Sequence, residues 1–407
     1  MAQSDTLKQS IVEGKIKFHE LDSIVDSKVA VDIRRHAIEE MVDTQLAEIG
    51  NYTIDAKGAS KRNIENMIGA IQIPVGIAGP LIVNGEYAKG SFYVPLATTE
   101  GALVASTNRG CSAITSSGGA DVRIFKDGMT RAPVFKTTGV IGSKKLVAWV
   151  NNMDNFKRMQ ECAASTTRFG ELVAVTPYVA GNNVYLRFIY DTKDAMGMNM
   201  VTIATDAVVD LIMSENDAEL VSLSGNMCAD KKPSAINLIE GRGKTVVADV
   251  RLSREIVIKK LKTTPERMVE VNIRKNLVGS ALSGSLGFNA HVANVVAAMY
   301  LACGQDAAHV VEASSSITFA DVDSDGGLYI SVTIPALQVG TVGGGTNIAT
   351  QHECLGIMGC AGSGKTPGHN AKKLAEIIAS AVLAGEISLI GAQAAKHLAQ
   401  AHQELGR

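Results

Sequence analysis

The stretch Ser224–Lys244, SGNMCADKKPSAINLIEGRGK, marks the point at which the main domain of this chain resumes after an inserted unit. Within it, Asp230, Lys231 and Lys232 stand in a row and are followed at once by Pro233. Proline fixes its own φ and favours extended geometry at the residue before it. We therefore predict a held loop with an extended backbone, from which the two lysines point to opposite sides. Taken alone, such a run is more often a solvated charged turn.

The composition is that of a globular protein with more than one domain. The 407 residues suffice for two or three domains, and 46% of them are hydrophobic. A formal net charge of −2 provides no basic field for nucleic acid. The six cysteines are scattered without a CxxC pair, and the polar N-terminus lacks the apolar core of a signal peptide. We expect reduced thiols in a cytoplasmic protein.

The order of expected elements indicates an α+β fold with three domains. Residues 1–63 are expected to form an N-terminal helical domain, with Asp26 or Ser27 capping a helix. Residues 64–132 contain short strands and tight turns, with a hairpin turn expected at NGE (84–86), followed by a helix after Gly101. Residues 133–223 follow the order β-α-β-β-α-β, with one helix expected over 143–156, which is the ferredoxin-like split unit. Residues 224–407 then complete the large domain.

The most apolar segment with small residues is Leu277–Cys303, LVGSALSGSLGFNAHVANVVAAMYLAC. Its polar residues Asn289, His291 and Asn294 would be costly in a membrane. We therefore predict one continuous buried helix here, at the centre of the large domain.

Two literal motif matches are interpreted as coincidences. Gly359–Thr366, GCAGSGKT, satisfies the phosphate-loop pattern, but no β-branched strand precedes it and Pro367 follows it. DVDSDGG, from Asp321, opens like a calcium loop, yet the position that needs a glutamate is Val332. We expect a hairpin turn there, and no metal site.

Three further residues carry weak signals alone. Glu100 lies at a strand–helix junction, Asp306 follows an apolar helix as a cap would, and His402 stands near the C-terminus. In their contexts, however, the chain closely resembles the 3-hydroxy-3-methylglutaryl-CoA reductase family from about Asn63 to His402. The segments that carry the resemblance are ENMIG (65–69), PVGIAGPL (74–81), ATTEGALVASTNRG (97–110), DGMTR (127–131), DAMGMNM (194–200), SGN…DKKPSAIN…EGRGK (224–244), NLVGS (276–280), NAH (289–291), GQDAA (304–308) and GTVGGGTN (340–347).

This resemblance implies the reduction of HMG-CoA to mevalonate with two NADPH, through mevaldehyde. Lys231 would stabilise the negative charge that develops on the reacting oxygen. Glu100 would supply a proton to the aldehyde oxygen, and Asp306 would sit between Glu100 and Lys231 and couple their titrations. His402, on a C-terminal flap, would protonate the departing CoA thiolate.

The resemblance also assigns binding residues. Those implied for the substrate are Arg131, Ser224, Asp230, Lys232, Lys275, His291, Asn294, Asn108 and Arg109. Those implied for the cofactor are Arg168, Asp194, Met196, Gly197, Met198, Asn199, Gly343 and Gly344. Arg168 would meet the 2′-phosphate, because a guanidinium suits a phosphate, and DAMGMNM resembles the class I form of the family, which favours NADP(H).

By the same resemblance we expect a homo-oligomer, a dimer of dimers, with the active site at the subunit interface. The chain lacks the membrane domain of the animal enzymes, so we expect a soluble archaeal-type form. Two alternatives remain open: a nucleotide-hydrolysing switch built on Gly359–Thr366, and a non-catalytic CoA-binding regulator. The second is disfavoured because a binding protein has no need of His402.

Overall fold

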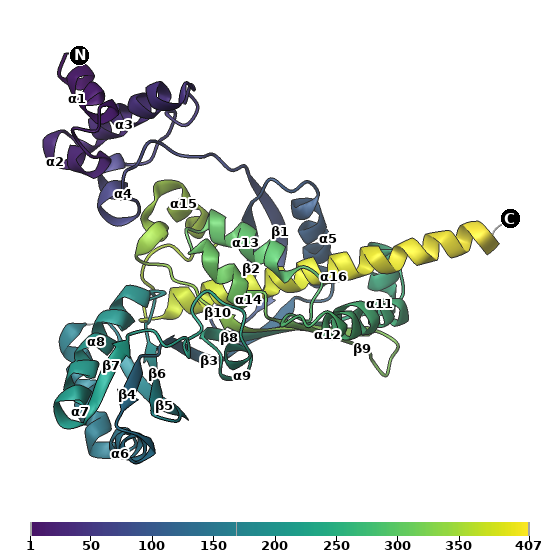
Figure 1. Cartoon of the computed structure of the whole chain (residues 1–407). Helices are drawn as coiled ribbons and strands as arrows, with labels where there is room; N and C mark the ends of the chain where they lie inside the picture. Colours follow the sequence, from purple (N-terminus) through teal and green to yellow (C-terminus); the bar gives the residue numbers. More distant parts are fainter. Residues whose placement is uncertain (1, 168, 406–407) are drawn as a thin grey trace.

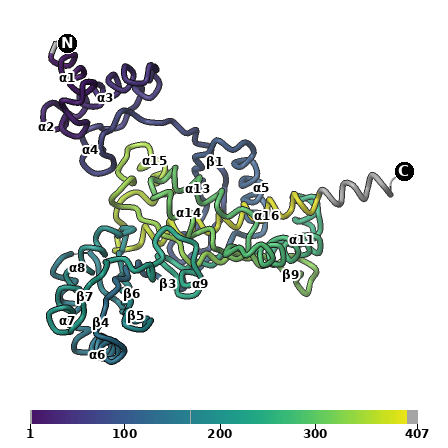
Figure 2. Tube along the Cα trace, viewed as in Figure 1, coloured from purple at the N-terminus to yellow at the C-terminus, as the bar shows by residue number. Residues whose placement is uncertain are grey.

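The computed structural model describes residues 2–167 and 169–405, with side chains for 3–167 and 169–395. An α+β fold is observed, in which a small helical unit stands apart at the N-terminus (Figures 1 and 2). Its elements are α1 (Ala2–Val12), η1 (Phe18–Glu20), α2 (Leu21–Ile24), α3 (Ser27–Val42) and α4 (Ala56–Arg62). The predicted cap is confirmed, because the Asp26 side chain accepts a hydrogen bond from the Lys28 amide at 3.0 Å.

The large domain is built on a twisted sheet. Its strands are β1 (Val75–Asn84), β2 (Lys89–Ala97), β3 (Ala120–Arg131), β8 (Gly243–Leu252), β9 (Ile317–Val322) and β10 (Leu328–Leu337). β1 runs parallel to β3, whereas β3, β8, β10 and β9 pair antiparallel in that order. The hairpin turns predicted at NGE and DVDSDGG are confirmed as the β1–β2 and β9–β10 connections. α5 (Leu103–Ser116) is the helix predicted after Gly101.

Between β3 and β8 the chain forms a smaller four-stranded antiparallel sheet. The elements are β4 (Val134–Thr137), α6 (Val140–Val150), α7 (Met153–Thr166), β5 (Glu171–Ala180), β6 (Asn183–Asp191), α8 (Met198–Glu215) and β7 (Ala218–Ser222). Their spatial order is β7-β4-β6-β5, and β6 also pairs with the end of β3. The prediction of one helix over 143–156 is wrong. The Asn152 side chain accepts hydrogen bonds from two amides and starts α7 as a second helix.

The predicted continuous helix over Leu277–Cys303 is also wrong. The segment is divided among η3 (Asn272–Gly279), α12 (Ser280–Leu282) and α13 (Val292–Ala302). Gly284 adopts a left-handed φ of 68°, and the Phe288 amide bonds to the Ser316 carbonyl at 2.8 Å, so the intervening chain leaves the helix. The long central helix is α16 (His369–Leu405), which crosses the large domain against the sheet and α5 (Figure 1).

Within the described chain, His369–Ala395 of α16 is long and apolar enough to cross a membrane, but 94% of its most apolar window is buried inside the structure. All six cysteines are free, as predicted. The remaining elements are α9 (Ala235–Glu240), α10 (Arg254–Ile256), η2 (Val257–Leu261), α11 (Pro265–Val271), η4 (Ala307–His309), α14 (Val310–Ala313), η5 (Gly344–Asn347) and α15 (Ala349–Ile357).

Candidate active site

Lys231 lies in the loop between β7 and α9, where the chain returns from the smaller sheet to the large domain. Its Nζ lies 2.9 Å from Asp306 Oδ2. Its backbone is not extended as predicted: φ is 57°, in the left-handed region. The local bias that Pro233 imposes acts on Lys232 only, and the Lys231 amide instead donates to Glu312 Oε1 at 2.6 Å. The loop is therefore shaped by a contact distant in sequence.

Asp306 follows α13 and caps η4, since its Oδ1 accepts a hydrogen bond from the Ala308 amide at 3.0 Å. Burial acts to raise the pKa of Asp306, but the hydrogen bond from Lys231 and that amide outweigh it and hold the pKa below its ordinary value. The same hydrogen bond raises the pKa of Lys231. The two groups therefore form a charged pair at neutral pH.

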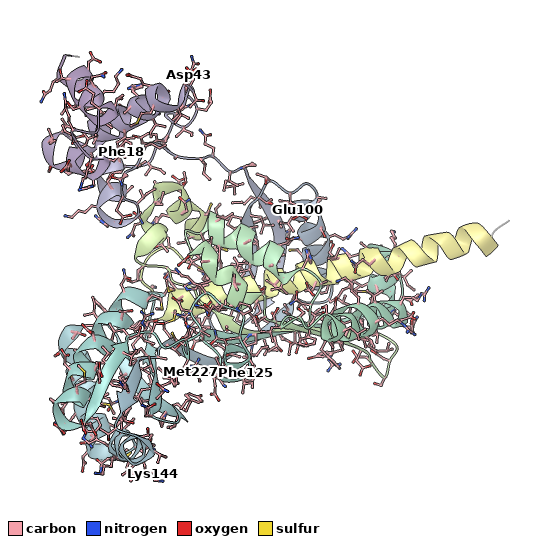
Figure 3. All side chains as sticks on the ribbon, viewed as in Figure 1. Phe18, Asp43, Glu100, Phe125, Lys144 and Met227 are labelled. Atoms are coloured by element: carbon pink, nitrogen blue, oxygen red, sulfur yellow. The ribbon has the colours of Figure 1, made fainter. Side chains whose placement is uncertain are left out.

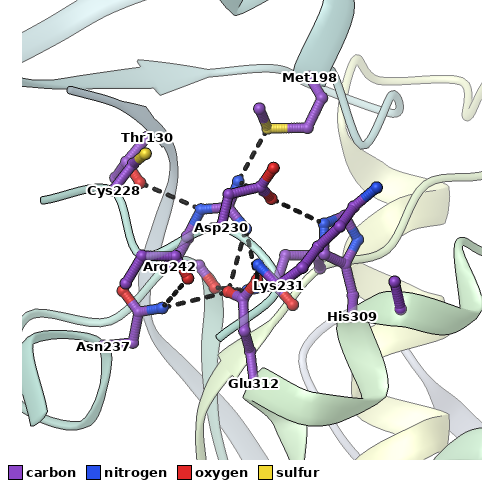
Figure 4. A network of polar contacts seen from close by, with 12 residues as sticks. Thr130, Met198, Cys228, Asp230, Lys231, Asn237, Arg242, His309 and Glu312 are labelled. Atoms are coloured by element: carbon purple, nitrogen blue, oxygen red, sulfur yellow. Dashed lines mark hydrogen bonds and ion pairs between the residues drawn. The ribbon is translucent and has the colours of Figure 1, made fainter. Parts of the chain in front are cut away.

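A buried polar network lies directly beneath Lys231 (Figure 4). Arg242, fully buried, donates from Nη1 to both Glu312 oxygens at 2.8 and 3.0 Å, and from Nη2 to Asp230 Oδ1 at 2.9 Å. His309 Nε2 donates to the same Asp230 oxygen at 3.2 Å. That hydrogen bond, followed by the charge of Arg242, holds the pKa of Asp230 well below its usual range. Burial raises the pKa of Glu312.

Asp230, His309 and Glu312 bring three potential metal-ligand atoms within 4.8 Å of one another. The guanidinium of Arg242 lies among them and bonds to both carboxylates. Positive charge is thus already supplied by a side chain, and the group is an ion-pair network.

Glu100 belongs to a second cluster, at the start of α13. Its Oε1 accepts a hydrogen bond from Asn294 Nδ2 at 3.3 Å, and Asn294 Nδ2 also lies 3.4 Å from His291 Nδ1. His291 Nε2 contacts the Gly385 carbonyl at 2.8 Å, and its backbone amide donates to the buried carboxylate of Glu386 at 2.8 Å. α16 therefore fixes His291, and through it the surroundings of Glu100.

Within one chain Asp306 pairs with Lys231, whereas Glu100 contacts Asn294. Glu100 lies at the N-terminal end of α13, whereas Asp306 follows its C-terminal end, where the Gln305 amide bonds back to the Tyr300 carbonyl. The 11 residues of α13 span roughly 16 Å. Figure 3 accordingly shows Glu100 and Met227, which precedes Lys231 by four residues, on different sides of the large domain.

The basic residues predicted to hold the substrate line the region around the Lys231 loop. Arg131 ends β3 half-buried, and its Nε has no partner among the described residues. Lys275 Nζ donates to Asn276 Oδ1 at 2.9 Å, and burial lowers its pKa. A cavity of about 560 Å³ lies between Lys275 and Pro233, and it is also lined by serines and Asn289. Lys232 is exposed beside Pro233.

Three other predicted substrate residues are engaged within the protein. Asn108 Oδ1 accepts a hydrogen bond from the Gly79 amide at 2.9 Å. Arg109 donates to the hydroxyl and carbonyl of Ser388 on α16, each at 3.0 Å. The Ser224 hydroxyl lies 3.6 Å from Cys228 Sγ. Asn108 and Arg109 therefore stabilise the packing of α5 against β1 and α16.

The predicted cofactor segments face each other. Gly197, with φ of 89°, precedes α8, and Ala195 forms a parallel bridge with Val342. Met196 packs against the core of the smaller sheet, Met198 opens α8, and Asn199 is exposed in its first turn. Gly343 and Gly344 also have positive φ, and a Cβ built on either would meet nothing within 4 Å. An open space therefore lies against these glycines, as a bound dinucleotide requires.

Asp194 is buried and points inward. Its carboxylate accepts hydrogen bonds from the amides of Gly364, Gly368 and Ala371 at 3.0 to 3.1 Å. These amides belong to GCAGSGKT and to the start of α16, so the anion at this helix N-terminus is a protein side chain. The preceding element is the helix α15 and not a strand. Both observations disfavour the nucleotide-switch alternative.

Two predicted residues, Arg168 and His402, fall outside the residues whose side chains are described. Their roles stay predictions.

Comparison with known proteins agrees with this geometry. A family model described as hydroxymethylglutaryl-coenzyme A reductase matches residues 30–407. The 3-hydroxy-3-methylglutaryl-coenzyme A reductases of Haloferax volcanii and Methanocaldococcus jannaschii are 56% and 54% identical to this chain, with 100% of each chain covered. That of Pyrococcus abyssi is 56% identical over 98% of each chain.

The chain belongs to the hydroxymethylglutaryl-coenzyme A reductase family. Its activity is accordingly the NADPH-dependent reduction of HMG-CoA to mevalonate. Among solved structures, the class II reductase from Streptococcus pneumoniae bound to NADPH in open conformations has a TM-score of 0.67 and 16% identity, over 85% of this chain and 82% of its own. At that identity the likeness shows a shared fold.

Several residues of this reductase lie beside Lys231 although no sequence signal assigned them a role. They are Asn237, Arg242, His309, Glu312 and Gln338. Asn237 and Arg242 lie in the DKKPSAIN and EGRGK segments, and their place in segments that carry the family resemblance could have indicated a role at the site. Glu312 had none, because a lone glutamate on a short helix is ordinarily exposed.

Proposed function

We propose that Lys231 and Asp306 form the reducing centre of this enzyme, with Lys231 stabilising the oxygen on which negative charge develops. The observation that carries this assignment is their 2.9 Å ion pair in the loop that joins the two sheets. A cation held in place before the reaction stabilises such charge without reorganisation. NADPH, when bound against the DAMGMNM and GTVGGGT segments, supplies the two hydrides.

The protons come from groups placed around this centre. Glu100 donates to the oxygen of the aldehyde formed after CoA leaves, and His402 protonates the departing thiolate. Arg131, Lys232 and Lys275 hold the carboxylate and neighbouring oxygens of the substrate. The unpartnered Nε of Arg131 and the cavity between Lys275 and Pro233 support this placement.

We also assign residues 133–223 as the NADP(H)-binding domain of a class I enzyme, inserted into the large domain formed by 64–132 and 224–407. Its own buried apolar cluster, including Phe135, Phe188 and Val208, supports a separate unit. The DAMGMNM form of the motif and Arg168 support NADP(H). The free cysteines suit the reducing conditions of the cytoplasm.

The positions of the two clusters support a complete site that is shared between subunits. Glu100 and the Lys231–Asp306 pair are separated by the length of α13 within one chain. If two copies associate so that Glu100 of one approaches Lys231 of the other, all three groups meet. We propose that the enzyme is such a homo-oligomer, with two of these sites in each dimer.

Hybrid enzymes test this proposal. Glu100→Ala and Lys231→Ala should each abolish activity. In a dimer that shares its sites, a mixed pair carries both changes in one site and neither in the other. Unfolding and refolding the two variants together in equal amounts should therefore restore about a quarter of wild-type activity, because half of the dimers are mixed. Mixing that restores no activity, with mixed dimers confirmed by native mass spectrometry, would contradict a shared site. Full activity of Lys231→Ala alone would contradict the role of Lys231.

A further inference from the structure

The Lys231 loop has an unusual backbone. Asn226, Ala229 and Lys231 have φ of 63°, 48° and 57°, so three non-glycine residues within six positions are left-handed. Residues with a Cβ occupy this region at a conformational cost and persist there only when their surroundings hold them. Lys231 is the residue whose ammonium must meet the substrate. The groups that constrain the backbone of Lys231 therefore determine the position of its ammonium.

Glu312 is the group that holds it. The side chain is fully buried on α14, and its Oε1 accepts the Lys231 amide at 2.6 Å. Oε2 accepts hydrogen bonds from Gln338 Nε2 at 2.7 Å and Asn237 Nδ2 at 3.2 Å. Arg242 Nη1 donates to both oxygens. Every group that faces this carboxylate is thus a donor.

The same network reaches the residue before Lys231. Arg242 Nη2 and His309 Nε2 both donate to Asp230 Oδ1, and Asn237 Nδ2 also donates to the Ala229 carbonyl at 3.2 Å. Arg242 Nη2 further contacts Met198 Sδ, in the first turn of α8, at 2.8 Å. The loop is therefore fixed at consecutive residues by groups anchored in the large domain.

We propose that Glu312 is a positioning residue for the reduction: its buried carboxylate fixes the left-handed backbone of Lys231 and thereby sets the position of the Lys231 ammonium. This inference rests on the role of Lys231 proposed above. A carboxylate is required because a neutral amide has one oxygen and one NH₂, and here the NH₂ would face a donor of Arg242, Asn237, Gln338 or Lys231. Loss of one partner in a buried network is costly.

Two substitutions separate the charge of this carboxylate from its reach to the Lys231 amide. Glu312→Gln keeps the length of the side chain but removes the charge that Arg242 faces. Glu312→Asp keeps the charge and withdraws it by about 1.5 Å, the length of one carbon–carbon bond, from the Lys231 amide. Both should lower kcat for HMG-CoA reduction by about tenfold or more, while KM for NADPH stays within about twofold of wild-type. Glu312→Asp should unfold at a higher temperature than Glu312→Gln.

Glu376→Gln is the matched control. Glu376 is also a fully buried glutamate that accepts backbone amides, those of Glu86, Tyr87 and Ala88 in the β1–β2 turn. Its substitution should lower thermal stability and leave kcat within about twofold of wild-type, because a stability loss of this kind does not move Lys231.

The outcomes are decisive in either direction. A tenfold or larger fall of kcat in Glu312→Asp, with kcat preserved in Glu376→Gln, supports the inference, and Glu312→Asp alone carries the test if Glu312→Gln does not fold. Wild-type kcat in Glu312→Asp, or an equal loss in Glu376→Gln, overturns it. If Lys231→Ala is inactive while the Glu312 variants are normal, only this inference fails. If Lys231→Ala is active, the role of Lys231 fails first.

Discussion

Replacing Asp306 with asparagine should lower the pKa of Lys231 and move the alkaline limit of activity to lower pH. The hydrogen bond from Asp306 is the largest cause that raises the pKa of Lys231, and burial opposes it. The side chains are 45% and 35% exposed, so solvent screens the pair. At 2.9 Å with the dielectric constant of water, the attraction is about 1.4 kcal/mol.

The sign of the effect follows from the protonation states. A raised lysine pKa stabilises the fold below the ordinary lysine value, and this contribution is lost as the pH rises through the raised value. Activity that needs the ammonium is lost over the same range. Without Asp306, both losses should begin at lower pH.

Two measurements check this expectation. The first is the pH dependence of the residual kcat in Asp306→Asn. The second is the rate at which an amine-specific reagent labels Lys231 as the pH rises, read by mass spectrometry, since only the neutral amine reacts. Asp323→Asn is the control, because Asp323 pairs with the exposed Arg251 at 2.6 Å on the β9–β10 hairpin and should leave both profiles unchanged. Identical labelling midpoints for Lys231 in wild-type and Asp306→Asn would refute the reasoning.

Two further changes test the cofactor segments. Asp194→Asn should lower the free energy of unfolding by about 2–4 kcal/mol, measured by chemical denaturation, because three amides lose a charged acceptor. It should also weaken NADPH binding, measured by fluorescence titration. An unchanged free energy of unfolding would contradict the role given to this carboxylate. Gly343→Val should raise KM for NADPH about tenfold without changing KM for HMG-CoA, because its Cβ would enter the open space against the glycines. Gly181→Val, with a similar positive φ and equally open surroundings on the β5–β6 turn, is the control for backbone strain, and an equal rise of KM there would contradict the assignment.

Much of the fold could be predicted because local signals determine its hairpins and strands. NGE and DVDSDGG gave the correct turns, and the strand order predicted for residues 133–223 agrees with β4, β5, β6 and β7. The prediction of one helix over Leu277–Cys303 was wrong because an apolar composition indicates that a segment is buried, but does not indicate that it forms a single unbroken helix. Gly284 breaks the helix there, whereas Gly385 and Gly391 remain inside α16, where they allow close contact with Val295 and Leu261.

The site was predicted residue by residue, but its geometry was not. The bias of Pro233 predicts an extended Lys231, whereas the observed left-handed φ depends on Glu312, which lies 81 residues further along the chain. No local pattern contains that information. Asp194 shows the same limit, since the amides that surround its carboxylate come from a segment 170 residues or more away.

The position of α13 supports the proposed sharing of the site between two chains. Glu100 contacts Asn294 in its first turn, and Asp306 follows its last turn, so a helix roughly 16 Å long lies between the two contacts. In a two-fold symmetric pair, the start of one α13 meets the end of the other, and the reverse contact follows from symmetry. A shared site therefore requires the two α13 helices to lie antiparallel across the axis, and it creates as many complete sites as there are chains.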